Sequence, residues 1–130
     1  MADIYVKPAA GGANDGTSWT DAYTDIQSAF DTMASGDDIW CQGTQTLTVT
    51  IDDDTLTSPT TYVKFWAVNS DETASPNQMD DVDGTMFVMD GNSAATNCML
   101  ISGSGRHYRA FTNFEFKNST SDCVTHSAAA

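Results

Sequence analysis

Residues 14–41 combine one helical pattern with the start of a strand, and the rest of the chain contains no second helical pattern. Between residues 20 and 33, apolar residues recur at helical spacing and form one stripe: Ala22, Ile26, Ala29, Phe30 and Met33. We expect Ser18 or Thr20 to cap the start of this helix and Gly36 to end it. A single amphipathic helix before a series of short strands predicts a lid on the end of a β-stack.

The remainder of the sequence consists of short strand patterns separated by polar turns. We expect strands at residues 3–6, 38–41, 47–51, 62–68, 85–89, 98–101, 107–111 and 114–117. In segment 47–51, Leu47, Val49 and Ile51 should face the core while the threonines at 46, 48 and 50 face outward, because strand side chains alternate. No helices alternate with these strands, which excludes a doubly wound α/β sheet.

The strand patterns also recur along the chain. Those centred on Trp40, Phe65, Val88 and Phe114 are about 25 residues apart, within the range of solenoid repeats. This spacing favours a stack of short coils, and an antiparallel sandwich with the same strands is the alternative.

Size and charge limit the partners. The 130 residues favour one domain, with a strand and capping helix at 1–36, coils at 37–126 and a frayed tail at 127–130. The net charge is −13, and the five basic residues are scattered rather than clustered. Without a basic patch to neutralise phosphates, nucleic acid and anionic membrane surfaces are not expected as partners.

The sequence shows no secretory signal and no segment of transmembrane length, so we expect synthesis in a cytoplasm. Cys41, Cys98 and Cys123 are odd in number and lack Cys-x-x-Cys spacing. Neither a disulfide framework nor a zinc site is predicted, and free thiols are expected.

Several polar groups are candidates for catalytic or metal-binding sites. The acidic runs at 52–54 and 80–83 fall in predicted turns, where aspartate is common, rather than in a groove with the fixed carboxylate separation of glycosidases. The segment at 81–84 lacks the first and last ligands of an EF-hand, because Met79 and Asp90 stand there. His107 and His126 have no partners at metal-ligand spacing. We therefore assign no catalytic residue, metal site or cofactor.

Aromatic residues offer two interpretations. Trp19, Trp40, Trp66 and the tyrosines could form a sugar-stacking platform, but packing in the core or under the cap is favoured.

Five N-terminal segments carry a resemblance: residues 4–8 (IYVKP), 14–19 (NDGTSW), 22–23 (AY), 26–30 (IQSAF) and 36–40 (GDDIW). Together they resemble the opening of right-handed parallel β-helix proteins of the pectin-lyase-like superfamily, and residues 62–67 and 111–118 resemble later coil strands. The resemblance implies an all-β fold, a short right-handed parallel β-helix of about four coils with an N-terminal helix cap. The cap-defining residues would be Trp19, Ile26, Phe30, Gly36, Ile39 and Trp40.

The family contains polysaccharide lyases and hydrolases as well as phage tail spikes, adhesins and virion proteins without catalysis, so the fold leaves the function open. The lyase motifs have no counterpart here, and the chain has room for about four coils. We expect a non-catalytic structural virion protein, either a phage capsid decoration protein or a tail spike or fibre component. The alternatives are a carbohydrate-binding or polysaccharide-depolymerising module that contacts a surface glycan, and a scaffold or adhesin fragment of a cellular protein.

The two ends of the predicted stack differ. The helix covers the first coil, whereas no amphipathic segment follows Phe116 to cover the last one. Phe111, Phe114 and Phe116 would then form an open assembly end. We expect protein partners at this end, through self-association, for example as a trimer, or through docking on a larger virion assembly.

Overall fold

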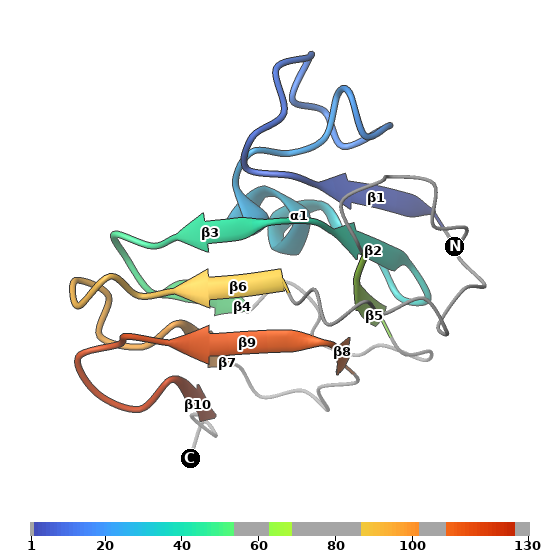
Figure 1. Ribbon diagram of the computed structural model, residues 1–130. Helices are drawn as coiled ribbons and strands as arrows, with labels where there is room; N and C mark the ends of the chain where they lie inside the picture. The colour runs from blue at the N-terminus through green and yellow to red at the C-terminus, as the bar shows by residue number, and fades with distance from the viewer. Residues whose placement is uncertain (1, 54–62, 69–86, 102–108, 127–130) are drawn as a thin grey trace.

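The structure is a computed structural model that describes residues 2–53, 63–68, 87–101 and 109–126. Within these ranges the chain is mostly strands with one short helix, an all-β arrangement (Figure 1). The elements are β1 (Asp3–Val6), α1 (Ile26–Thr32), β2 (Asp38–Cys41), β3 (Thr44–Thr46), β4 (Ile51–Asp53), β5 (Val63–Ala67), β6 (Phe87–Asp90), β7 (Met99–Ile101), β8 (Arg109–Thr112), β9 (Phe114–Lys117) and β10 (Val124–His126).

The strands form three sheets, which we name by letter. Sheet A has the order β1-β2-β5-β8, sheet B the order β3-β6-β9, and sheet C the order β4-β7-β10. Every strand pair is parallel, which excludes the antiparallel sandwich for the described chain. After β1 and α1, the chain passes through sheets A, B and C three times in that order. We call the three passes the first rung (β2, β3, β4), the second rung (β5, β6, β7) and the last rung (β8, β9, β10).

The pairing places equivalent positions of successive rungs side by side. In sheet A, Ile4 pairs with Ile39, Ile39 with Phe65, and Phe65 with Phe111. The offset is 26 residues from β2 to β5, 27 from β6 to β9 and 25 from β7 to β10. It is 44 from β3 to β6, 48 from β4 to β7 and 46 from β5 to β8, so a uniform spacing of about 25 residues is wrong. The predicted step from Phe65 to Val88 is wrong, because these residues lie in different sheets, A and B.

Single residues in the left-handed backbone region turn the chain from sheet A to sheet B. Gly43, with φ of 97°, separates β2 from β3, and Asn113, with φ of 59°, separates β8 from β9. Glycine and asparagine adopt this region more readily than other residues, since a branched or bulky Cβ meets the following carbonyl there. Both corners therefore use a residue with positive φ, a glycine in one and an asparagine in the other.

The helix is shorter than the sequence predicted. It begins at Ile26, and its N-cap is Asp25, whose carboxylate accepts a hydrogen bond from the Gln27 amide at 3.0 Å. Neither Ser18 nor Thr20 caps it. Ser18 instead donates through its hydroxyl to the Asp21 carboxylate at 3.0 Å, within a loop that precedes the helix.

The end of the helix also differs from the prediction. Met33 is the C-cap, and its amide donates to the Ala29 carbonyl. Gly36 comes three residues later and has φ of 88°, so its left-handed conformation turns the chain toward β2 rather than ending the helix.

Segment 47–51 is a connection rather than the predicted strand. Strand β3 ends at Thr46 and β4 begins at Ile51. Leu47 and Ile51 are buried as predicted, but Val49 is 68% exposed, so strict alternation through this segment is wrong. Thr46 and Thr48 are exposed, as expected. The aspartates Asp52 and Asp53, assigned above to a turn, belong to β4 and pair with residues of β7.

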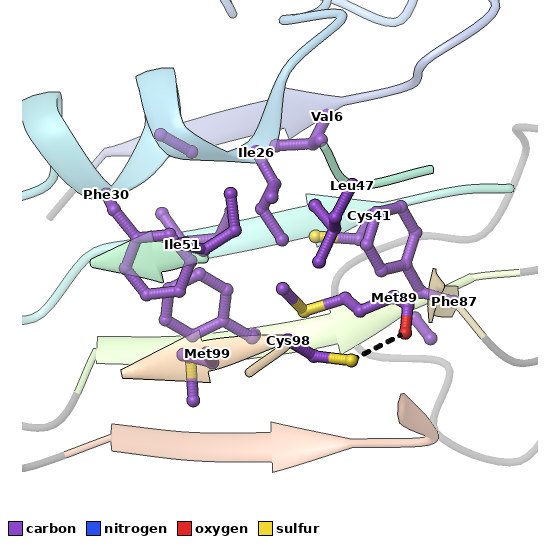
Figure 2. Packing of buried hydrophobic residues seen from close by; sticks show 14 of the residues in the cluster. Val6, Ile26, Phe30, Cys41, Leu47, Ile51, Phe87, Met89, Cys98 and Met99 are labelled. Carbon is purple, nitrogen blue, oxygen red and sulfur yellow. Dashed lines mark hydrogen bonds between the residues drawn. The ribbon is translucent and has the colours of Figure 1, made fainter. Parts of the chain in front are cut away.

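The core lies inside the three sheets and beneath the helix (Figure 2). Its largest fully buried side chains are Phe30, Phe65, Phe87, Ile26, Ile39, Met89 and Met99. The first amide of α1, at Ile26, donates to the Gln45 side-chain oxygen of β3 at 3.1 Å. This bond ties the helix to the first rung and satisfies one of the donors that a helix start leaves free.

Candidate functional site

The residues expected to form the cap divide between the interior and the outer face of sheet A. Ile26, Phe30 and Ile39 have no exposed surface and belong to the core, where the Phe30 ring stacks on Phe65. Gly36 is buried in the turn before β2. Together with the contacts of α1 with β1 and β4, these residues pack the helix against the core.

Trp19 and Trp40 lie outside this core cluster. Trp40 follows the inward-facing Ile39 in β2, so it points to the outer face of the sheet. Trp19 is half-buried and packs edge-on against Tyr5 of β1, with ring centroids 4.9 Å apart. Of the six residues, Ile26, Phe30 and Ile39 therefore belong to the core cluster, whereas Trp19 and Trp40 do not.

The last rung is less buried than the rung above it. Phe111, Phe114 and Phe116 are half-buried, whereas their register partners Phe65, Phe87 and Met89 have no exposed surface. Sheet C shows the same contrast, because Val124 of β10 is 42% exposed and its partner Met99 is buried. All three sheets therefore lose burial together at the last rung.

The three phenylalanines form one contiguous cluster. The ring centroids of Phe111 and Phe114 are 5.3 Å apart, and each lies 6.0 Å from that of Phe116. Within the described residues, β8, β9 and β10 each pair with one neighbouring strand and stand at the edge of their sheets. Partly exposed aromatic surface beside strand edges is a kind of surface that another chain can cover. We call Phe111, Phe114, Phe116 and Val124 the end surface.

A second group of aromatic residues lies on the outer face of sheet A. Tyr5, Trp40 and Trp66 occupy the same register position in β1, β2 and β5. The two indoles are stacked, with centroids 5.8 Å apart and planes inclined by 13°. Trp40 is almost fully buried, whereas Trp66 keeps part of its surface accessible. We call these three residues the aromatic row.

Two carboxylates accept hydrogen bonds from the indole N–H groups of the aromatic row. The Trp40 Nε1 group donates to Asp3 at 3.0 Å, and the Trp66 Nε1 group donates to Asp38 at 2.9 Å. Asp38 also forms an ion pair with Lys64, at 3.7 Å. The expected platform included the tryptophans and the tyrosines but neither carboxylate. The equal spacing of Ile39–Phe65 and Trp40–Trp66 is the signal that would have placed the indoles together.

The acidic and histidine candidates do not form a described site. Asp54, Asp80, Asp81, Asp83 and His107 lie outside the described residues, and His126 is in β10. Among the residues that the structure does describe, no three His, Cys, Asp or Glu side chains are placed to hold one metal ion. In the same part of the chain, no helix has the length and apolarity needed to cross a bilayer.

A groove of about 240 Å³ lies between the start of α1 and the connection that leads to β4. Its lining includes Asp25, Gln27, Gln45, Leu47 and Ile51. Among its described lining residues Asp25 is the one ionisable group, and the carboxylate already caps the helix. The described lining therefore does not supply the pair of carboxyl groups used in acid–base hydrolysis of a glycoside.

Comparison with protein-family models, with curated proteins and with solved structures yields no match to this chain.

Proposed function

We propose that this chain is a short right-handed parallel β-helix that serves as a non-catalytic structural component of a virion. Three features support the fold: the repeated order of sheets A, B and C, the parallel pairing in every sheet, and the left-handed corners at Gly43 and Asn113. The right-handed coiling of the proposed β-helix follows the strong preference of parallel crossover connections for this hand. Counted by its rungs, the solenoid would have three coils after the capping strand and helix.

The contrast in burial at the end surface carries the functional proposal. A solenoid buries its core between neighbouring coils, so each terminal coil needs a cover. The helix covers the first rung, whereas Phe111, Phe114, Phe116 and Val124 keep apolar surface accessible on the last rung. We infer that protein covers this end, either identical subunits, for example in a trimer, or a larger virion assembly on which the chain docks.

The resemblance to a superfamily that includes phage tail spikes and virion proteins supports placing the protein in a virion, as a capsid decoration protein or a tail spike or fibre component. The acidity, with a net charge of −13, is consistent with an exposed position on a particle in solution. The chain would be made in the host cytoplasm and incorporated during assembly.

Two exposed valines provide a matched test of the assembly proposal. Val124 is on the end surface, and Val49 is exposed on the connection between β3 and β4. If subunits associate through the end surface, Val124→Asp places a charge in a buried contact and dissociates the multimer measured by light scattering. Val49→Asp leaves the same multimer intact.

A monomeric wild type calls for a further measurement. Docking on a larger assembly predicts a poorly soluble monomer whose solubility improves in Val124→Asp. A soluble monomer at high concentration with slow amide exchange through Phe114–Lys117 would contradict both forms of the proposal.

The virion assignment is tested directly on particles. An antiserum raised against the purified chain should label intact, gradient-purified particles of the virus that carries the gene, both in immunoblots and in immunogold electron microscopy. Absence of the chain from purified particles, with its recovery in the cell fraction instead, would overturn the assignment.

The aromatic row favours one alternative function, a carbohydrate-binding or polysaccharide-depolymerising module. A partly exposed indole beside carboxylates and Lys64 is a surface on which a sugar ring can stack and hydrogen-bond. A glycan array would detect specific binding that is lost in Trp66→Ala and retained in Val49→Ala. Release of reducing sugars would support the depolymerising form, and the structural proposal predicts neither result.

A further inference from the structure

Two cysteines occupy neighbouring positions in sheet C. Met99 of β7 pairs with Val124 of β10, so Cys98 and Cys123, each one residue earlier, stand beside one another on parallel segments. The Cys98 amide donates to the Cys123 carbonyl at 2.9 Å, which fixes the two backbones side by side. Adjacent strands are about 4.8 Å apart, inside the range of roughly 4.4–6.8 Å between the Cα atoms of disulfide-linked residues.

The two side chains also approach each other. Cys98 is fully buried, and Cys123 is half-buried against the same core cluster. Burial raises the pKa of the Cys98 thiol, and the adjacent Cys123 thiol raises this pKa further. The Cys98 sulfur lies 3.4 Å from the Met89 carbonyl oxygen (Figure 2). On the other side, the Ser119 hydroxyl donates to the Cys123 sulfur at 3.4 Å.

We propose that Cys98 and Cys123 form an intramolecular disulfide when the folded protein meets a small disulfide oxidant such as oxidised glutathione, so that the last rung becomes linked covalently to the second rung. Cys123, the more accessible of the two, reacts first. Its thiolate attacks one glutathione sulfur, forms a mixed disulfide and releases one glutathione thiolate.

The second step closes the bond. Cys98 gives up its proton and attacks the Cys123 sulfur, and the second glutathione leaves. The two protein thiols are oxidised to one disulfide, and one oxidised glutathione is reduced to two glutathione molecules. Because the backbones are already in register, the bond forms without rearrangement of β7 and β10.

Cys41 is an internal control within the same chain. It is fully buried in β2, and burial raises its pKa well above the ordinary thiol value. Its register partners are Val6 and Ala67, so it has no cysteine beside it in the sheet. Cys41 should therefore stay reduced under conditions that oxidise the other two.

The test uses the full chain in native buffer with oxidised glutathione, followed by alkylation and non-reducing peptide mapping. We expect one intrachain link between the Cys98 and Cys123 peptides, with Cys41 alkylated only after denaturation. The oxidised protein should melt several degrees above the reduced protein, because the link restricts the unfolded chain. In Cys123→Ser, where Cys98 has lost its partner, glutathione should neither oxidise Cys98 nor change the melting temperature.

Any one of four other results would overturn the proposal. They are a stable glutathione adduct on Cys123 with Cys98 still reduced, a disulfide between two chains, a disulfide that includes Cys41, and three free thiols after treatment. Since Cys123→Ser changes a half-buried side chain, it should fold even if Cys98→Ser does not. The comparison therefore does not depend on the buried variant.

Discussion

The ring of Phe30 stacks on the ring of Phe65, with centroids 4.9 Å apart and planes inclined by 24°. Phe30 is in α1 and Phe65 is in β5 of the second rung. Phe65 in turn stacks on Phe111 of the last rung, at 4.7 Å. One column of aromatic rings therefore runs from the helix to the opposite end of the sheets.

Phe30→Ala should destabilise the protein by about 3 kcal/mol, because it removes a fully buried ring and leaves a cavity beside Phe65. Asp31→Ala, at the exposed neighbouring position of the same helix, is the control. Chemical denaturation of both variants measures the difference. Equal midpoints would mean that the helix does not seal the first rung.

Leu47 and Val49 test the corrected course of segment 47–51. Leu47→Ala should cost about 2–4 kcal/mol, since Leu47 is 3% exposed and belongs to the core. Val49→Ala should change stability by less than about 0.5 kcal/mol, because its side chain faces solvent. A comparable loss in the two variants, measured by denaturant titration, would restore the alternating strand that the sequence predicted.

Gly43 and Asn113 test the shared corner conformation. The nearest atom to a Cβ placed on Gly43 is Pro8 Cδ at 4.0 Å, so a side chain has room there. Only the positive φ of the backbone disfavours a residue other than glycine. Gly43→Ala should cost about 1–2 kcal/mol, because alanine disfavours φ of 97°. Gly43→Asn should lower the stability less than Gly43→Ala does, because asparagine occupies the corresponding corner at position 113. Equal losses in thermal melts of the two variants would argue against a common corner.

Asp37 joins the N-terminal segment to the turn after the helix. Its carboxylate accepts hydrogen bonds from the Ala2 amide at 2.7 Å and the Ala34 amide at 2.8 Å, and the residue is 4% exposed. Asp37→Asn should lower stability by about 1–3 kcal/mol, since the amide group offers one acceptor oxygen and places N–H groups against a backbone donor. Asp31→Asn, at an exposed position, is the control in the same denaturation series. Matching stabilities would show that this carboxylate does not anchor the turn.

Asp90 gives a prediction for pH dependence. The Asn92 amide and the Asn118 side chain both donate to its carboxylate at 2.9 Å and hold its pKa below the ordinary value. A lowered pKa in the folded state means that these bonds favour folding above the ordinary aspartate pKa. Their contribution is lost as the pH falls through the folded value.

The measurement is an NMR titration of the carboxyl groups. Asn118→Gly removes the side-chain donor and suits the left-handed backbone there, where φ is 56°. The Asp90 pKa should rise part of the way toward normal in this variant. Asp15, whose pKa is lowered by hydrogen bonds from Thr17, should titrate as in the wild type. An unchanged Asp90 midpoint would contradict the role given to Asn118.

Local patterns were sufficient for part of the fold. Strand β5 was predicted almost to its ends, because Val63, Phe65 and Ala67 are buried and alternate with half-exposed residues. The helix was placed correctly but extended too far toward its start. Ala22 fits the helical spacing, yet it is buried in the loop before the Asp25 cap.

The missed features depend on residues distant in the chain. Strand β3, with the sequence Thr-Gln-Thr, and strand β10, with Val-Thr-His, have no apolar alternation. Their strand conformation follows from hydrogen bonds to β6 and β7. The pairing of Trp40 with Trp66 and of Cys98 with Cys123 likewise depends on inter-strand register, which local periodicity does not determine.

The difference between the helix-covered first rung and the accessible last rung gives the molecule a polarity. At the opposite end of the described chain, α1 packs beside β4, the outer strand of sheet C, whereas β1 stands at the edge of sheet A. If copies associate through the end surface, as proposed, a head-to-tail contact would not meet three matching sheet edges on the next copy. The helix would then favour a contact between like ends, which closes an assembly instead of extending it.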